Sequence, residues 1–175
     1  MIENVVFKHF YFIEYIYKDL CNRLFMARES ALSELTLRRY EKPYNLEKRE
    51  LMRKICLSLG LLQPGDSRDV IVDVLLVLED ARKKKEKLNS FDIVKKVEEE
   101  RKTNNVEVKG IAESNIRRQL KRLRDLMLVN KEENLYWINE FESLKNLFEA
   151  KIESFVIPQT IERIKDYLAE LEKNS

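Results

Sequence analysis

The sequence predicts a mainly α-helical protein that contains one small β-hairpin. Only three glycines and three prolines occur in 175 residues, and hydrophobic residues recur at helical spacing through most of the chain. Residues 128–138 differ, because they alternate in short hydrophobic runs around the polar tip Glu132-Glu133-Asn134. That pattern is typical of a hairpin. The chain is therefore expected to fold into helices with one short two-stranded element.

The distribution of charge says more than the net charge of +2. Residues 109–131 carry seven Lys or Arg against two acids, a local charge of +5, and residues 132–175 carry five against ten, a local charge of −5. A basic centre followed by an acidic section indicates that any contact with nucleic acid lies in the middle of the chain. The 23 Glu and 19 Lys against three Gln are typical of proteins from hot environments, where ion-pair networks replace labile amides.

The first 40 residues contain neither Gly nor Pro and predict one long helix. A helix with so apolar a face must pack on something, and we expect it to pair with a second copy in a homodimer. Packing on the rest of the chain is the alternative, and a strand over residues 5–17 is another reading of the same residues. The hydrophobic positions follow an unbroken heptad rhythm: Val6, Phe10, Ile13, Tyr17, Leu20, Leu24, Ala27 and Ala31.

Charged residues interrupt this stretch, so we expect neither a membrane-spanning helix nor a signal peptide, and a cytoplasmic protein. His9 lies among its aromatic residues and is expected to be a packed edge residue rather than a ligand. With one His in the chain, and Cys21 and Cys56 lying 35 residues apart, no metal site and no disulfide framework can be assembled. The glycines stand singly, without a phosphate-binding loop. We therefore predict no catalytic residue, no cofactor and no enzyme activity.

A second helix is expected over residues 46–59, with Gly60 as its stop and a turn at residues 63–66. Its buried side is predicted from spacing to contain Met52, Ile55, Cys56 and Leu59. The turn is the predicted boundary between an N-terminal helical region, residues 1–64, and a central domain that begins at residue 65.

The central domain is predicted to begin with two helices. Asp66 or Ser67 caps the first, which is strongly apolar from Val70 to Leu78. Ser90 caps the second, which ends near Arg101 and buries Phe91, Ile93, Val94 and Val97. In the connection that follows, residues 106–108 are expected to form a short strand that pairs with the hairpin.

The next helix, residues 111–126, has one narrow apolar stripe and an opposite face rich in arginine. The stripe consists of Ile116, Leu120, Leu123 and Leu126. Five of the eight residues from Arg117 to Arg124 are basic. The hairpin comes directly after this helix.

The sequence Ile-Ala-Glu-Ser-Asn-Ile-Arg-Arg-Gln-Leu-Lys-Arg-Leu, with the exit Leu-Met-Leu-Val-Asn, resembles the recognition helix and wing of a winged helix-turn-helix domain. The resemblance covers about residues 67–139. Met127 stands where related regulators usually have Gly, so this helix is expected to end differently or to run longer. The resemblance implies a sequence-specific transcription regulator of archaeal type that binds double-stranded DNA as a homodimer, with the transcription machinery as a further partner. The alternative is a winged domain that binds protein in a replication, transcription or chromosome-organising complex.

The resemblance assigns residues 65–139 to DNA binding and residues 140–175 to C-terminal helices. Base edges in the major groove would be read by Ser114, Asn115, Arg117, Arg118 and Lys121. Phosphates or the adjacent minor groove would be contacted by Arg122, Arg124, Lys131 and Asn134. For each of these residues the alternative role is surface solubility.

The C-terminal section predicts two amphipathic helices separated by Pro158. The first is expected to begin with a capping box at Asn139 and Glu142. Its apolar positions are Phe141, Leu144, Phe148, Ile152 and Phe155; those of the second are Ile161, Ile164, Leu168 and Leu171. Both helices could bind the N-terminal helix, a symmetry mate or another protein.

Overall fold

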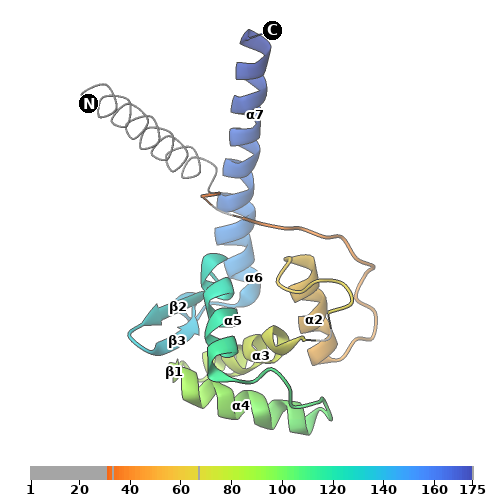
Figure 1. The fold of residues 1–175 in the computed structure, drawn as a ribbon, viewed down its shortest axis with the longest axis vertical. Coiled ribbons are helices and arrows are strands. Elements are labelled where there is room, and N and C mark those ends of the chain that lie inside the picture. Colours follow the sequence, from red (N-terminus) through yellow and green to blue (C-terminus); the bar gives the residue numbers. More distant parts are fainter. Residues whose placement is uncertain (1–30, 33, 67, 175) are drawn as a thin grey trace, which may run out of the picture. The chain divides into compact units, whose positions relative to one another are not determined.

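The structure, a computed structural model, describes residues 31–32, 34–66 and 68–174 (Figure 1). Residues 1–30 of the predicted N-terminal helix lie outside the described residues, together with His9 and Cys21. Residues 34–40, which the prediction placed in the same helix, are not helical, so that part of the prediction is wrong. The chain divides into two compact units, Met1–Glu34 and Leu35–Ser175. All helices and strands described below belong to the second unit.

Helix α3, Val70–Lys83, is the centre of this unit. Almost all of its side chains up to Ala81 are buried, because α2 (Lys48–Ser58), α4 (Ser90–Thr103) and α5 (Glu113–Asp125) pack around it. The unit also contains a small β-sheet, which consists of the strands β1 (Leu88–Asn89), β2 (Val129–Glu132) and β3 (Leu135–Ile138) (Figure 1). The fold is therefore mainly helical with a three-stranded antiparallel sheet in the order β1-β3-β2.

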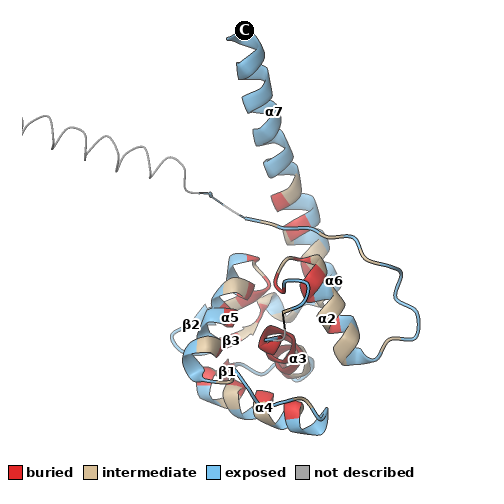
Figure 2. Cartoon of the chain, turned by 45° about the vertical axis from the view of Figure 1, so that its right-hand side comes forward, coloured by how far each residue is buried: buried red, intermediate tan, exposed pale blue. Residues whose placement is uncertain are grey.

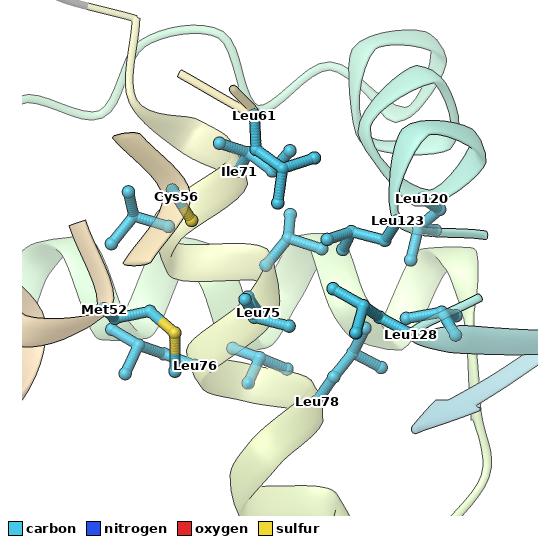
Figure 3. Packing of buried hydrophobic residues seen from close by; sticks show 14 of the residues in the cluster. Met52, Cys56, Leu61, Ile71, Leu75, Leu76, Leu78, Leu120, Leu123 and Leu128 are labelled. Atoms are coloured by element: carbon cyan, nitrogen blue, oxygen red, sulfur yellow. The ribbon is translucent and has the colours of Figure 1, made fainter. Parts of the chain in front are cut away.

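One hydrophobic core joins α2 to the sheet (Figure 3). Cys56 of α2, Leu75 of α3 and Leu123 of α5 are fully buried in it. Leu128 lies between the end of α5 and β2 and fills the gap beside α3 (Figure 3). The predicted stop of α2 at Gly60 is confirmed by its φ of 67°. Burial raises the pKa of the Cys56 thiol to about 12, so this cysteine is a packing residue.

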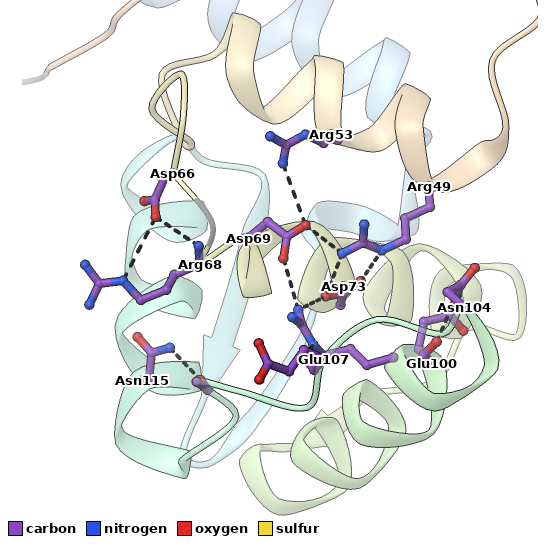
Figure 4. Close-up of polar contacts among 12 residues, drawn as sticks. Arg49, Arg53, Asp66, Arg68, Asp69, Asp73, Glu100, Asn104, Glu107 and Asn115 are labelled. Atoms are coloured by element: carbon purple, nitrogen blue, oxygen red, sulfur yellow. Dashed lines mark hydrogen bonds and ion pairs between the residues drawn. The ribbon is translucent and has the colours of Figure 1, made fainter.

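A buried cluster of ions ties α2, α3 and α4 together (Figure 4). Arg101, near the end of α4, donates to Asp73 and, at 3.2 Å, to Asp69. Arg49 of α2 donates to Asp69 at 2.7 Å and to Asp73 at 2.9 Å. Burial opposes ionisation of Asp69, but hydrogen bonds and charges from the two arginines lower its pKa below the ordinary value. The cluster satisfies charges that would otherwise be too costly to bury.

Two predicted helix caps are wrong, because neighbouring residues take their places. Asp69, not Asp66, precedes the first turn of α3, and the side chain of Asp66 instead accepts from the backbone N–H of Arg68 at 2.9 Å. Ser67 lies outside the described residues. Asn89 caps α4 by accepting from the N–H of Asp92 at 2.9 Å, so Ser90 lies inside the helix and is buried.

Two residues predicted to face inward are exposed instead. Ile55 is 41% exposed and Phe91 is 58% exposed. The buried face of α2 consists of Met52, Cys56 and Leu57. Leu57 therefore takes the place on that face that the prediction gave to Ile55. Phe91 follows the first residue of α4 and instead lies under the ammonium group of Lys95, at 4.5 Å from the ring centroid.

The third strand lies before α4, not in the connection between α4 and α5. Leu88 pairs with Tyr136 and Asn89 with Leu135 of β3. The prediction of a strand at residues 106–108 is wrong, because the N–H of Val106 bonds back to the carbonyl of Arg101 at 2.8 Å and closes the end of α4. The N–H of Val106 is therefore part of a turn and does not pair with the hairpin.

Met127, two residues after the end of α5, has the left-handed conformation that the resemblance associates with Gly. Met127 has φ 58°. Its N–H bonds to the carbonyl of Arg124 at 2.8 Å, and the N–H of Leu128 bonds to that of Leu123 at 3.0 Å. These two bonds form a Schellman motif. The expectation that Met127 would change or lengthen the end of the helix is therefore wrong.

The C-terminal section is one uninterrupted helical run. After a 3₁₀ turn at Asn139–Phe141 come α6 (Leu144–Leu147), a π-helical segment (η2, Phe148–Val156) and α7 (Ile157–Lys173). Ser143 caps α6 by accepting from the N–H of Asn146 at 3.1 Å, so the predicted capping box at Asn139 is wrong.

Pro158 does not interrupt this run. Proline is tolerated in the first turn of a helix, and Pro158 lies in the first turn of α7. Phe155, one of the predicted apolar positions of the first C-terminal helix, is half-exposed. No helix among the described residues is long and apolar enough to cross a lipid bilayer.

Candidate nucleic-acid interface

Helix α5 buries one face and exposes the opposite one. The predicted stripe is confirmed, because Ile116, Leu120, Leu123 and Leu126 are all buried. Gln119 is buried beside them. The exposed residues of the helix include Ser114, Arg117, Arg118, Lys121 and Arg124. The basic face of α5 is thus turned toward solvent.

Asn115 fixes the entry into α5 from the preceding loop (Figure 4). Its Nδ2 donates to the carbonyl of Gly110 at 2.6 Å, and its Oδ1 accepts from Arg118 at 2.8 Å and from Gln119 at 3.0 Å. Both ends of the amide are engaged within the protein. The geometry therefore makes Asn115 a residue that orients Arg118.

The first turn of α5 is linked to the hairpin turn through Ser90. The buried Ser90 hydroxyl lies 2.6 Å from Oε1 of Glu113 and 3.2 Å from Oδ1 of Asn134. Arg117 donates to the same Glu113 oxygen at 2.7 Å. The hydrogen bond with Ser90 and the charge of Arg117 lower the pKa of Glu113. Asn134 and Arg117 therefore lie close together, and both are engaged in this network.

Arg122 also contributes to packing. Its guanidinium donates to Oε1 of Gln119 at 2.9 Å and to the carbonyl of Gly60 at 3.4 Å. The side chain is partly buried between α5 and the turn that follows α2. Arg122 therefore holds the turn at Gly60 against α5.

Two basic clefts flank the exposed face of α5. The first has a volume of about 350 Å³ and is lined by Leu62, Asp66, Arg68, Asn115, Arg118, Gln119 and Arg122. The second has a volume of about 300 Å³ and is lined by Arg124, Asp125, Met127, Val129, Asn130, Lys131, Asn139 and Lys151. Each cleft brings together cations that are distant in the sequence.

Arg68 and Lys151 are the residues that the sequence prediction missed. Arg68 lies in the short segment between the 63–66 turn and α3. Its place in the basic cleft beside Arg118 is what marks it as a candidate DNA-contacting residue. Lys151 lies on η2, 20 positions after Lys131, and its ammonium group is 3.4 Å from Glu140. No spacing in the sequence connects either residue to α5, since each reaches its cleft through tertiary packing.

Two lysines lie over aromatic rings of the hairpin in cation–π contacts. Lys131 lies 5.8 Å from the centroid of the Tyr136 ring. Lys87, before β1, lies 4.0 Å from the Trp137 ring and 3.0 Å from Glu132. Lys131 remains exposed and faces the same cleft as Arg124.

An apolar groove lies elsewhere on the unit, between α2 and α6. It has a volume of about 510 Å³ and is lined mainly by Leu46, Leu51, Ile55, Leu59, Leu144 and Phe148. Among the described residues, no group of His, Cys, Asp and Glu could hold a metal ion.

No family model, curated protein or solved structure matches this chain significantly. The class is therefore defined by the fold alone, a mainly helical chain with a three-stranded antiparallel sheet.

Proposed function

We propose that residues 70–138 form a winged helix-turn-helix domain and that the protein is a sequence-specific, DNA-binding transcription regulator acting as a homodimer. In this proposal α4 and α5 are the helix-turn-helix pair, α5 is the recognition helix, and β2 with β3 is the wing. The order of α3, α4, α5 and the hairpin supports it, since the resemblance implies this order. The pairing of β1 with β3 adds a third short strand beside the wing.

The single observation that carries the function is the exposed basic face of α5 between two basic clefts. Ser114, Arg118 and Lys121 line the N-terminal and middle part of this face, and Arg124 lies at its C-terminal end. An α-helix fits the major groove of B-DNA, where base edges are distinguishable. Cations on both sides of the helix suit the phosphates of the two strands that border that groove.

The proposed roles divide according to how free each side chain is. Arg118 reads a base, because its side chain is exposed and Asn115 accepts from only one Nη atom of its guanidinium, at 2.8 Å. Arg124 and Lys131 contact phosphates from their shared cleft. Asn115, Arg117, Arg122 and Asn134 support the surface through the contacts described above.

The test is a salt titration of binding to the best duplex selected from a random pool and to a random duplex. Arg118→Ala is expected to cost about 1–3 kcal/mol on the selected duplex and far less on the random one. Arg124→Ala is expected to weaken both alike and to lower the salt slope by roughly one. Arg163→Ala, which removes an exposed cation from α7, is the matched control and should leave both affinities unchanged. If Arg118→Ala leaves the ratio of the two affinities unchanged, α5 does not read sequence.

The apolar groove favours a second candidate function, a protein-interaction module of a larger complex. Leu51 and Ile55 are exposed along it, and large exposed apolar surface is typical of docking sites. Absence of duplex binding at low salt by the folded protein would support this candidate over DNA binding.

A further inference from the structure

Helix α7 presents a row of large apolar side chains to solvent. None of its residues is buried (Figure 2). Ile161, Ile164 and Leu168 are 48%, 53% and 55% exposed. With Leu171, and with Ile157, which is partly buried against the core, they follow a spacing of four, three, four and three residues. This is the heptad spacing of a coiled coil, with Ile161 and Leu168 at a and the others at d.

A solitary helix with such a face is unfavourable in water. A 17-residue helix without tertiary packing is marginal, and most helical stability in proteins comes from packing of the apolar face. The other side of α7 is polar, with charges such as Arg163 and Asp166 paired to each other at 3.3 Å. The helix is therefore built to be covered along one narrow stripe.

We propose that the stripe of α7 pairs with the stripe of α7 in a second copy of the chain, as a parallel two-stranded coiled coil. The inference rests on the proposed homodimer and identifies the segment that joins its two subunits. In a parallel pair each apolar position meets its own copy, so Ile161 packs on the partner's Ile161 and Leu168 on the partner's Leu168. Residues of equal size then meet in every layer.

The residues that flank the stripe favour the parallel orientation. A parallel pair brings Thr160 beside the partner's Lys165 and Tyr167 beside the partner's Glu172, since residues at g and the following e positions are neighbours. Both contacts join a hydroxyl to an ion. The hydroxyl of Thr160 donates to the carbonyl of Val156 at 2.8 Å and keeps its lone pairs for the ammonium group. An antiparallel pair centred on the stripe brings Lys165 beside the partner's Lys165, which is repulsive.

The apolar stripe of α7 could also be covered by the N-terminal stripe, the heptad positions from Val6 to Ala31. The lengths of the stripes favour a second α7 instead. The heptad positions from Val6 to Ala31 number eight, against five on α7 from Ile157 to Leu171. Pairing these two stripes would leave three apolar positions of the N-terminal stripe uncovered. Two copies of α7 cover each other completely.

The first experiment measures mass by light scattering on the full chain, without DNA. The parent should have twice the protomer mass of 21.0 kDa. At about 10 μM, Ile164→Lys should have the mass of one protomer, since a charge buried in the middle of the stripe opposes pairing. Gln159→Lys adds the same charge on the polar side of α7 and should leave the mass doubled. Because Ile164 is exposed in the single chain, circular dichroism should show that the winged unit of the variant stays folded. A doubled mass for Ile164→Lys would overturn the proposal, as would dissociation by Leu20→Lys in the N-terminal stripe but not by Ile164→Lys.

The second experiment tests orientation by oxidation, in a Cys21→Ser background. Leu171→Cys should form a disulfide between subunits, since both copies of this position meet only in the parallel pair. Glu170→Cys, one residue away and outside the stripe, should cross-link far more slowly. Failure of Leu171→Cys to cross-link in a dimer that Ile164→Lys dissociates would reject the parallel orientation. Loss of DNA binding alone moves none of these readouts, so this inference and the proposed function fail separately.

Discussion

Replacement of Arg101 by Met tests whether the buried ion cluster holds α4 and the loop before α5. Met keeps the apolar stem and removes the guanidinium, which donates to Asp73, to Asp69 and, at 2.8 Å, to the carbonyl of Glu107. Arg49 still pairs with both carboxylates, so neither is left without a cation. Breaking a buried pair by removing one partner costs about 3–5 kcal/mol, and the remaining arginine favours the lower end of that range. This is a large part of a total stability of about 5–15 kcal/mol.

The assay is equilibrium unfolding in urea at pH 7 and low protein concentration. Lys102→Met, at the next position of α4, is the matched control. Lys102 pairs with Glu98 at 2.6 Å across an exposed surface, and such pairs contribute about 0–1 kcal/mol. Equal effects of Arg101→Met and Lys102→Met, both below about 1 kcal/mol, would refute the reasoning. A double-mutant cycle of Arg101→Met with Asp69→Asn should show a coupling of about 0.5–3 kcal/mol, since the two side chains are in contact.

Two further outcomes are expected. Met127→Gly should raise the free energy of unfolding by about 1 kcal/mol, because the left-handed backbone at φ 58° costs a residue with a side chain about that much. Met127→Ala keeps this cost and should not raise the free energy of unfolding. Urea unfolding of both variants measures the difference. Asp69 has a lowered pKa in the folded protein, so its stabilising contribution is fully present above the ordinary pKa of about 4 and is lost as the pH falls through the lower folded value. Urea midpoints between pH 6 and pH 2.5 should therefore fall steeply in the parent and less steeply in Asp69→Asn, and equal slopes would contradict this role for Asp69.

Local periodicity predicted the back of α5 correctly, because its burial depends on spacing within one helix. Ile116, Leu120 and Leu123 lie on one side wherever the helix is placed, and the hairpin followed from alternation over a few residues. Phe91 and Ile55 were predicted wrongly for a related reason. Periodicity identifies a stripe but not which of its edges meets the core, and that depends on the crossing of neighbouring helices.

Contacts between distant residues account for the other differences. Ser90 carries the sequence signature of a cap, but Asn89 performs this role, and the Ser90 hydroxyl lies beside Glu113 and Asn134, which are 23 and 44 positions away. The arginines of α5 look equivalent in sequence. Arg122 is nevertheless engaged with a carbonyl 62 positions away, and Arg118 is not. Which cation is free to bind a partner is therefore a property of the tertiary structure.

The long connection between α4 and α5 illustrates how such contacts bear on the proposed function. The nine residues from 104 to 112 exceed the three or four of a minimal helix-turn-helix, and an unrestrained loop of that length would let α5 shift relative to α4. Two side chains prevent this, one from each helix. Arg101 holds the carbonyl of Glu107 from the end of α4, and Asn115 holds that of Gly110 from the start of α5. Because Asn115 also holds Arg118, the same contacts that order the loop orient the arginine proposed to read the base.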